Sequence, residues 1–312
     1  MKKVFTFLTA LVVLILTSNS ISAYDFEVDG LYYKINYDKK SVTVTYKVDE
    51  VTYKSIRTQK EVVKIPKKVS YKGVGYKVTA ISEGAFQGCA NLKKVTIPKT
   101  VTYIGECAFS ESGIESVEVP SSVVGYMAFQ SCPHLKSVRL SDNVCVIEDL
   151  VFAECNNLES VSVGKSVAFV GKNVLVKCPN LTTLTVNPKN NNFDSRNNCN
   201  AIVNKYSNEL VSACKATTIP ESVEIIGEGV FNGLKDLSTL TIPENVKVIA
   251  ANAFCHLSNL TVLTCLAVDL PACNNDSFYG IDKSHCTLRV PAQSVEKYKA
   301  HNVWSEFRIV GF

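Results

Sequence analysis

Cysteine and histidine are the residues of this chain that could carry chemistry, because thiols and imidazoles act as nucleophiles, bases and metal ligands. The 312 residues include 12 cysteines but only 4 histidines. Zinc sites use closely spaced pairs such as C-x₂-C, and no such pair occurs here. His285 and Cys286 are adjacent, which in a strand sends their side chains to opposite faces. The sequence therefore predicts neither a metal site nor a bound cofactor.

Nucleophilic catalysis needs a base within reach of a serine or cysteine. Cys255 and His256 are neighbours, but they follow Phe254 in a repeated turn where the other copies have ordinary residues such as Gln-Gly or Ser-Glu. Neither G-x-S-x-G, H-E-x-x-H nor a glycine-rich phosphate loop occurs. The adjacent carboxylates Glu148 and Asp149 are expected to be solvated in a turn. We therefore expect no enzymatic activity.

Several cysteines recur at one position, three residues after a repeated apolar marker. They are Cys89, Cys132, Cys155 and Cys178. A cysteine that recurs with a repeat is typically a small buried side chain, and disulfides between such residues would need a specific geometry. Cys199 and Cys214 flank a segment with two strand-like runs, so a disulfide across that segment is the better-placed alternative.

These cysteines belong to a sequence repeat, and the repeat must also position the remaining side chains of the chain. Phenylalanine recurs at steps of 20 to 24 residues on either side of a gap of 79 residues, and Leu175 fills the same position within that gap. The markers are Phe86, Phe109, Phe129, Phe152, Phe231, Phe254 and Phe278. A period of this length is typical of leucine-rich repeats.

Each marker is followed by the phrase Leu-x-x-Leu/Val-x-Ile/Val, whose last two apolar residues alternate with polar ones. This alternation predicts a short strand with one buried face. Proline follows in many copies, for example Pro98 and Pro220, and ends the strand because it cannot donate to a ladder. One unit cannot bury its own apolar face, but stacked units can. The sequence therefore predicts an α/β-type repeat solenoid dominated by β-structure, a right-handed leucine-rich-repeat coil with a parallel sheet.

The repeat is irregular in two places. The unit from Phe109 to Phe129 is three residues short, and an Asn-rich insertion with two strand-like runs is expected to form a hairpin that protrudes from the stack. The predicted organisation is a signal peptide at 1–23, an N-terminal β-hairpin cap at 24–80, repeats at 81–186, the inserted hairpin at 187–218, repeats at 219–290, and a C-terminal cap with a short helix at 291–312.

The chain opens with a lysine pair, an apolar run from Val4 to Leu16 and then small polar residues up to Ala23. This layout predicts a secretory signal peptide that is cleaved after Ala23 or one residue earlier. An uncleaved anchor is the alternative, although the run is shorter than a spanning helix needs. We expect a secreted or cell-surface protein, with the periplasm as an alternative, and no membrane insertion after cleavage.

The chain from residue 24 onward has 31 basic and 29 acidic side chains, a net charge of +2. Proteins that bind nucleic acid usually carry a strong basic field. The overall charge therefore gives no support for nucleic-acid binding.

The phrase IPxxVxxIGxxAFxxCxxLxxVxI is clearest at Ile97–Phe109, Ile219–Ile242 and Ile242–Leu263. It resembles the BspA-like leucine-rich-repeat family of bacterial secreted and surface proteins, as do the segments FDSRNNCNAI and CTLRVPAQSVEKYKAHNVW. The resemblance covers about residues 60–312. It implies a non-catalytic binding protein, since members are associated with adhesion to host or matrix proteins and with cell–cell contact.

Two rows of side chains should point outward from the stacked strands, on a surface that we call the strand face. One row is Lys94, Ser116, Ser137, Ser160, Thr183, Thr239 and Val262. The other row is Thr96, Glu118, Arg139, Ser162, Thr185, Thr241 and Thr264. Solenoids bind partners through such extended faces, although serine and threonine also suit strands that are merely solvated. The predicted ligand-binding residues are Lys94, Thr96, Glu118, Arg139, Ser162 and Thr185.

We therefore expect an exported protein–protein interaction module, adhesin-like or surface-associated, with a host, matrix or bacterial-surface protein as its partner. The alternative is a glycan-binding protein of the cell surface or periplasm. Sugar sites usually stack aromatic rings, and the predicted strand face has none. The alternative depends instead on tyrosines of the N-terminal cap, namely Tyr32, Tyr33, Tyr37, Tyr46 and Tyr53.

Overall fold

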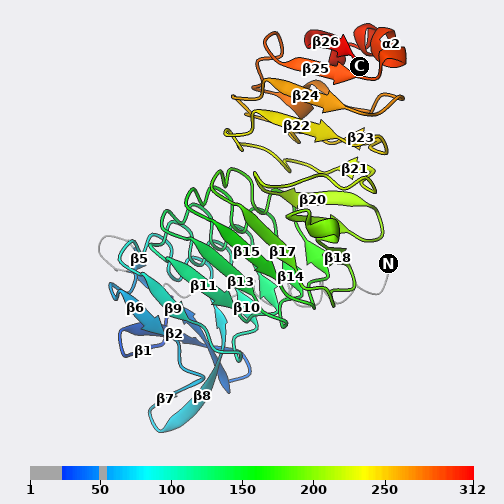
Figure 1. Ribbon diagram of the computed structural model, residues 1–312. Coiled ribbons are helices and arrows are strands. Elements are labelled where there is room, and N and C mark those ends of the chain that lie inside the picture. Colours follow the sequence, from blue (N-terminus) through cyan, green and yellow to red (C-terminus); the bar gives the residue numbers. More distant parts are fainter. Residues whose placement is uncertain (1–22, 49–54) are drawn as a thin grey trace.

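The computed structural model describes residues 23–48 and 55–312, so the predicted signal peptide, apart from Ala23, lies outside the described residues. The chain winds into stacked coils, and most coils give one short strand to each of two parallel sheets (Figure 1). Within the described residues, no helix has the length and apolar character to cross a bilayer. The predicted β-dominated solenoid is confirmed.

The first part of the strand face, up to Thr185, is the outer side of the first sheet, which we call the strand-face sheet. Its strands pair in parallel and are β6 (Val62–Lys64), β9 (Lys94–Thr96), β11 (Ser116–Val119), β13 (Ser137–Leu140), β15 (Ser160–Val163) and β17 (Thr183–Val186). The sheet starts before the expected boundary at residue 81, because Val63, Ile65 and Pro66 already carry the repeated phrase. Alternate residues such as Val117 and Val138 are buried beneath it.

The second sheet runs along another side of the same coils, and we call it the back sheet. Its parallel part consists of β8 (Val74–Ile81), β10 (Tyr103–Ile104), β12 (Val123–Val124), β14 (Val146–Ile147) and β16 (Phe169–Val170). These strands arise from the Val-x-x-Ile-Gly part of the repeated phrase, which follows the proline. From the sequence alone, this part suggests only a connection between the strand of the strand face and the phenylalanine marker. The inward residue of each step, for example Ile104 or Ile147, is buried.

The N-terminal region is the predicted array of β-hairpins. Its strands are β1 (Phe26–Val28), β2 (Leu31–Ile35), β3 (Ser41–Thr45) and β7 (Lys68–Tyr71), with β4 (Lys47–Val48) and β5 (Ser55–Ile56) paired separately. β7 pairs antiparallel with β8, and β3 pairs parallel with β8, which joins the array to the back sheet. Phe26 stacks on Tyr71 with 4.3 Å between ring centroids. The array therefore covers the first coil.

A ladder of phenylalanine rings fills the core where the coils turn. The rings of Phe109 and Phe129 stack with 4.9 Å between centroids, and both are fully buried. The backbone amide of Phe152 donates to Val174, as that of Phe129 does to Val151, which places Leu175 in the phenylalanine position. The recurring cysteines lie beside the ladder, and the Cys155 thiol donates to the carbonyl of Phe129 at 3.2 Å. They are the buried side chains that the repeat predicts.

The short unit after Phe109 closes by a close backbone approach. Gly113 donates its backbone amide to Cys89, and a side chain at Gly113 would place its Cβ 2.0 Å from the carbonyl oxygen of Ala90. The other units have one more residue in this turn. Glycine is therefore required here for space.

The inserted hairpin does not protrude, which corrects our expectation. It consists of β18 (Phe193–Asp194), η1 (Arg196–Asn198), β19 (Ala201–Asn204) and β20 (Glu209–Ala213). β20 pairs in parallel with β21 (Ile225–Ile226), which in turn pairs in parallel with β23 (Val248–Ile249). Ile202 packs into the core of the first half of the chain, whereas Val203 and Leu210 pack into the core of the second half. The hairpin lies between the two halves because both of its faces are apolar (Figure 1).

The second half repeats the strand pattern and ends in a compact cap. Its remaining elements are β22 (Thr239–Ile242), β24 (Val262–Cys265), η2 (Asn275–Phe278), β25 (Thr287–Val290), η3 (Ala292–Ser294), α2 (Val295–Ala300), η4 (Trp304–Glu306) and β26 (Arg308–Gly311). Tyr298 and Trp304 are fully buried against the last coil, so the expected C-terminal helix cap is confirmed. The cap also adds β26, which pairs in parallel with β25 and extends the sheet.

Candidate functional site

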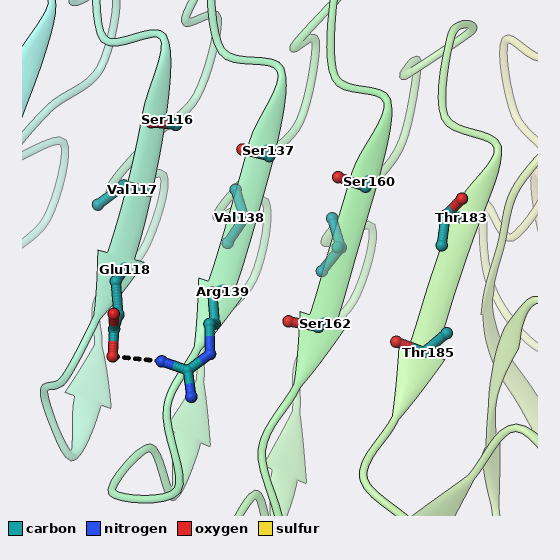
Figure 2. A pocket seen from close by; sticks show the side chains of 11 residues that line it. Ser116, Val117, Glu118, Ser137, Val138, Arg139, Ser160, Ser162, Thr183 and Thr185 are labelled. Atoms are coloured by element: carbon teal, nitrogen blue, oxygen red, sulfur yellow. Dashed lines mark hydrogen bonds and ion pairs between the residues drawn. The ribbon is translucent and has the colours of Figure 1, made fainter.

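The strand register aligns the two outward rows as the sequence predicts. Ser116, Ser137, Ser160 and Thr183 are neighbours on successive strands. The second row is parallel to the first and runs through Glu118, Arg139, Ser162 and Thr185. Figure 2 shows their hydroxyl, carboxylate and guanidinium groups on the same side of the sheet. The alternation arises because successive side chains of a strand point to opposite faces.

These rows line a shallow hollow of about 320 Å³ on strands β11, β13, β15 and β17. Glu118, Arg139, Ser162 and Thr185 line it, as do the four hydroxyl residues of the first row. Lys94 and Thr96 do not line it, because they lie one strand further toward the N-terminus on β9. The structure therefore brings together four of the six predicted residues.

One ion pair crosses the hollow. A nitrogen of the Arg139 guanidinium lies 2.5 Å from a carboxylate oxygen of Glu118, and both side chains are more than half exposed (Figure 2). Such an exposed pair contributes at most about 1 kcal/mol to stability. Both groups therefore remain accessible to a ligand, and the hydroxyls beside them can donate and accept hydrogen bonds. None of the residues that line the hollow is aromatic.

The outward rows extend beyond the residues that the sequence pattern predicted. At the N-terminal end, Val62 and Lys64 on β6 are neighbours of Lys94 and Thr96. At the C-terminal end, the rows continue from Val262 and Thr264 into β25 and β26. The added residues are Thr287, Arg289, Arg308 and Val310. The alternating run TLRV of β25 would have revealed the extension, but it starts one residue later after its marker, Phe278, than in most coils, and Ser284 occupies the place of the usual leucine.

The inserted hairpin divides the strand face into two parts. β17 ends the strand-face sheet, and β22 begins a separate sheet with β24, β25 and β26. The hydroxyl of Ser195 takes the place of a neighbouring strand, because it accepts a hydrogen bond from the amide of Val186 at 3.0 Å. The predicted rows are therefore continuous from Lys94 to Thr185 but not from there to Thr239.

The cysteine and histidine that could have formed a catalytic pair are not brought together. The Cys255 thiol is buried and donates to the carbonyl of Asp276 at 3.0 Å, whereas His256 is exposed and packs edge-on against Tyr279. Cys286 is buried, whereas the imidazole of His285 is exposed, although both residues lie before β25 and not in a strand. The described residues contain no group of three or more His, Cys, Asp or Glu side chains arranged to hold a metal ion.

The adjacent carboxylates of Glu148 and Asp149 bind backbone amides instead of being freely solvated, which corrects our expectation. Glu148 accepts a hydrogen bond from the amide of Tyr126 at 2.7 Å, and Asp149 accepts one from the amide of Lys172 at 2.8 Å. Each bond connects neighbouring coils. Both carboxylates therefore contribute to stacking.

The structure does not form the suggested bridge between Cys199 and Cys214. Both thiols are free and buried, and they belong to the cores on opposite sides of the hairpin. The Cys214 thiol instead donates to the carbonyl of Asn200 at 3.3 Å. Burial raises the pKa of both thiols above its ordinary value. A disulfide would require one of the side chains to leave its core.

We therefore predict that all 12 cysteines, which lie between residues 89 and 286, are alkylated in denaturant without a reductant. In the folded protein at about pH 8, where thiolates react, Cys145 should be alkylated first because it is exposed. Cys178 should react only after unfolding, because burial raises its pKa to about 12 and keeps it protonated. Mass spectrometry of the alkylated chain gives the count, and two unmodified cysteines at 199 and 214 would contradict the prediction.

The geometry defines a class of protein, a β-solenoid with an extended polar strand face. The sequence pattern of the BspA type leucine rich repeat region matches the chain in six copies, over residues 79–204 and 201–299. This match spans more than half of the chain, which therefore belongs to that family. Among curated proteins, none matches the chain in sequence.

Two solved structures have a similar fold. A leucine-rich cell surface protein from Faecalibacterium prausnitzii is 17% identical, with 92% of this chain and 94% of that chain covered and a TM-score of 0.52. The pneumococcal vaccine antigen PcpA is 15% identical, with 93% of this chain and 99% of that chain covered and a TM-score of 0.59. At these identities, the likeness concerns the fold.

Proposed function

We propose that this protein is an exported, non-catalytic module that binds another protein through the strand face, in an adhesin-like or surface-associated role. The observation that carries the proposal is the hollow on β11 to β17, where the accessible Glu118 and Arg139 lie beside one row of four hydroxyls and share their own row with the hydroxyls of Ser162 and Thr185. Extended faces of this kind are where solenoids bind partners. The cell-surface and antigen descriptions of the two structural neighbours support a surface location.

A protein partner fits the hollow better than a neutral glycan does. Sugar recognition commonly uses an aromatic ring as a stacking platform, and the lining residues offer none. The hollow instead offers one carboxylate, one guanidinium and several hydroxyls, which can pair with backbone and charged groups of a protein segment. The partner is a host, matrix or bacterial-surface protein.

The test is capture from host-matrix and bacterial-surface extracts with residues 24–312 as bait, followed by titration of the purified captured protein. A variant with Ser137→Glu, Ser162→Glu and Thr185→Glu should bind the partner at least about tenfold more weakly. The three added carboxylates repel acidic groups of the partner or lose their water at the interface without gaining a partner charge. The measurement is the Kd by calorimetry or a surface biosensor.

The matched control places the same kind of change away from the strand face, as Thr102→Glu, Ser166→Glu and Thr218→Glu. This control should bind like the unchanged chain. Equal weakening in both variants, or unchanged binding in the first, would remove the strand face as the binding site. Thermal unfolding of both variants checks that the solenoid is intact.

A further inference from the structure

The near-zero net charge of the chain conceals a separation of charge along the solenoid. Residues 24–99 contain 15 Lys and Arg against 8 Asp and Glu, a net charge of +7. Residues 100–312 contain 16 basic against 21 acidic side chains, a net charge of −5. The positive charge is therefore concentrated at the N-terminal end of the stack.

Much of this positive charge gathers where the chain passes from the strand-face sheet to the back sheet. Lys64 ends β6, and Lys67 and Lys68 follow directly after the proline that closes the phrase. The register pairs Lys64 with Thr96, so Lys99 occupies the turn of the next coil that corresponds to Lys67. The first two coils thus place lysines in the same corner of the stack.

The later coils do not continue this arrangement. All but one of them have a neutral or acidic residue at the position of Lys67, as the register of the strands shows. The exception is Lys165, whose ammonium group lies 3.7 Å from the carboxylate of Asp142 in the preceding coil. At the position of Lys67, lysines without an acidic partner are therefore confined to the first two coils.

A fifth lysine joins this group from β8. Lys77 lies directly opposite Lys68 in the antiparallel pairing of β7 with β8. Like charges in directly opposed positions destabilise a strand pair. We call Lys64, Lys67, Lys68, Lys77 and Lys99 the corner lysines. A bound anion would relieve the repulsion between the opposed pair.

The corner lysines are exposed, and in the part of the chain that the structure describes none of them makes an ion pair. Nearby Lys93, by contrast, lies 3.1 Å from the carboxylate of Glu61. Lys94 of the strand face lies on the neighbouring β9 and adds to the positive charge at this end. The structure thus leaves a group of cations without acidic neighbours in contact.

We propose that the corner lysines bind an anionic polysaccharide that carries sulfate or carboxylate groups at intervals along its chain. Lysine ammonium groups on flexible stems bind anions as point charges, which suits a polymer whose charges are spaced over several sugars. The side chains come from two successive turns and a hairpin, so they match an extended ligand. The site is separate from the hollow on β11 to β17, and the polysaccharide assignment rests on the proposed export.

The test uses residues 24–312 and a heparin fragment of defined length as the sulfated probe, with neutral dextran as the uncharged comparison. At about 0.15 M ionic strength, heparin should bind saturably and dextran should not. The variant K67Q/K68Q/K77Q/K99Q should bind heparin roughly 10- to 100-fold more weakly, and its affinity should depend less steeply on salt. The corresponding Lys→Arg variant should retain the affinity, because the charges remain.

The matched control removes four lysines elsewhere, as K136Q/K189Q/K215Q/K235Q, and should bind heparin within about twofold of the unchanged chain, since these charges lie outside the site. Equal weakening in this control would overturn the proposal, because net charge alone would explain it. Failure of the unchanged chain to bind heparin would also overturn the proposal. Vesicles rich in phosphatidylserine are a second anionic probe, and binding to these vesicles but not to heparin would overturn it as well. None of these results depends on the strand-face partner, so the two proposals fail or stand separately.

Discussion

Phe109→Ala should lower the free energy of unfolding by about 3–5 kcal/mol, as removal of a large buried ring usually does. Phe109 is fully buried between Phe86 and Phe129, with 4.9 Å between ring centroids on each side and interplanar angles of 4°. The substitution leaves a cavity and deprives both neighbours of their stacking partner. Urea unfolding followed by circular dichroism measures the loss.

Two further variants make this prediction specific to the ladder. Phe169→Ala removes the same ring from a side chain that is 53% exposed, so it should cost less than about 1 kcal/mol. Phe109→Leu should cost less than Phe109→Ala, because Leu175 already occupies one position of the ladder and is buried there. Similar losses for Phe109→Ala and Phe169→Ala would show that the ladder does not hold the coils together.

The stacked coils could be predicted from the sequence because each coil must place the same kinds of side chain in the same positions. The phenylalanine marker, the alternating strand and the following proline recur together, and a stack satisfies all three at once. The same periodicity predicts which side chains share a row, and the strand register confirms it for Glu118, Arg139, Ser162 and Thr185.

The back sheet could not be predicted in this way. Its strands in the repeats, such as β10 and β12, have only two residues each, and alternation needs about four residues to be recognised. The position of the hairpin was also missed. Ala201, Ile202 and Val203 are consecutive and all buried, which reflects burial on both faces, yet a short apolar run does not reveal what covers either face.

The corner lysines show a different limit. Lys67, Lys77 and Lys99 are separated by 10 and 22 residues in the sequence, and the total charge of the chain averages them against acids in later coils. Only the pairing of β6 with β9 and of β7 with β8 brings them to one end of the solenoid. Charge counted by coil, instead of over the whole chain, would have found them.

The second large effect concerns the C-terminal cap, where Trp304→Ala should cost about 3–5 kcal/mol. Trp304 is fully buried, its ring lies 4.9 Å from that of Phe278 and 5.4 Å from that of Tyr298, and its indole N–H donates to the carbonyl of Pro271 at 3.4 Å. The substitution opens a cavity against the last coil and removes that hydrogen bond. Urea unfolding measures the loss, with Phe312→Ala, whose ring is 52% exposed, as the control.

The position of the loss along the chain matters as much as its size. In a solenoid each coil contacts only its neighbours, so removal of the cap should open the nearest coils first. Hydrogen exchange in the Trp304→Ala variant should therefore accelerate most in β25 and β26, less in β22, and least in β11 and β13 on the far side of the inserted hairpin. Equal acceleration in all of these strands would instead mean that the two cores, although divided by the hairpin, unfold as one cooperative unit.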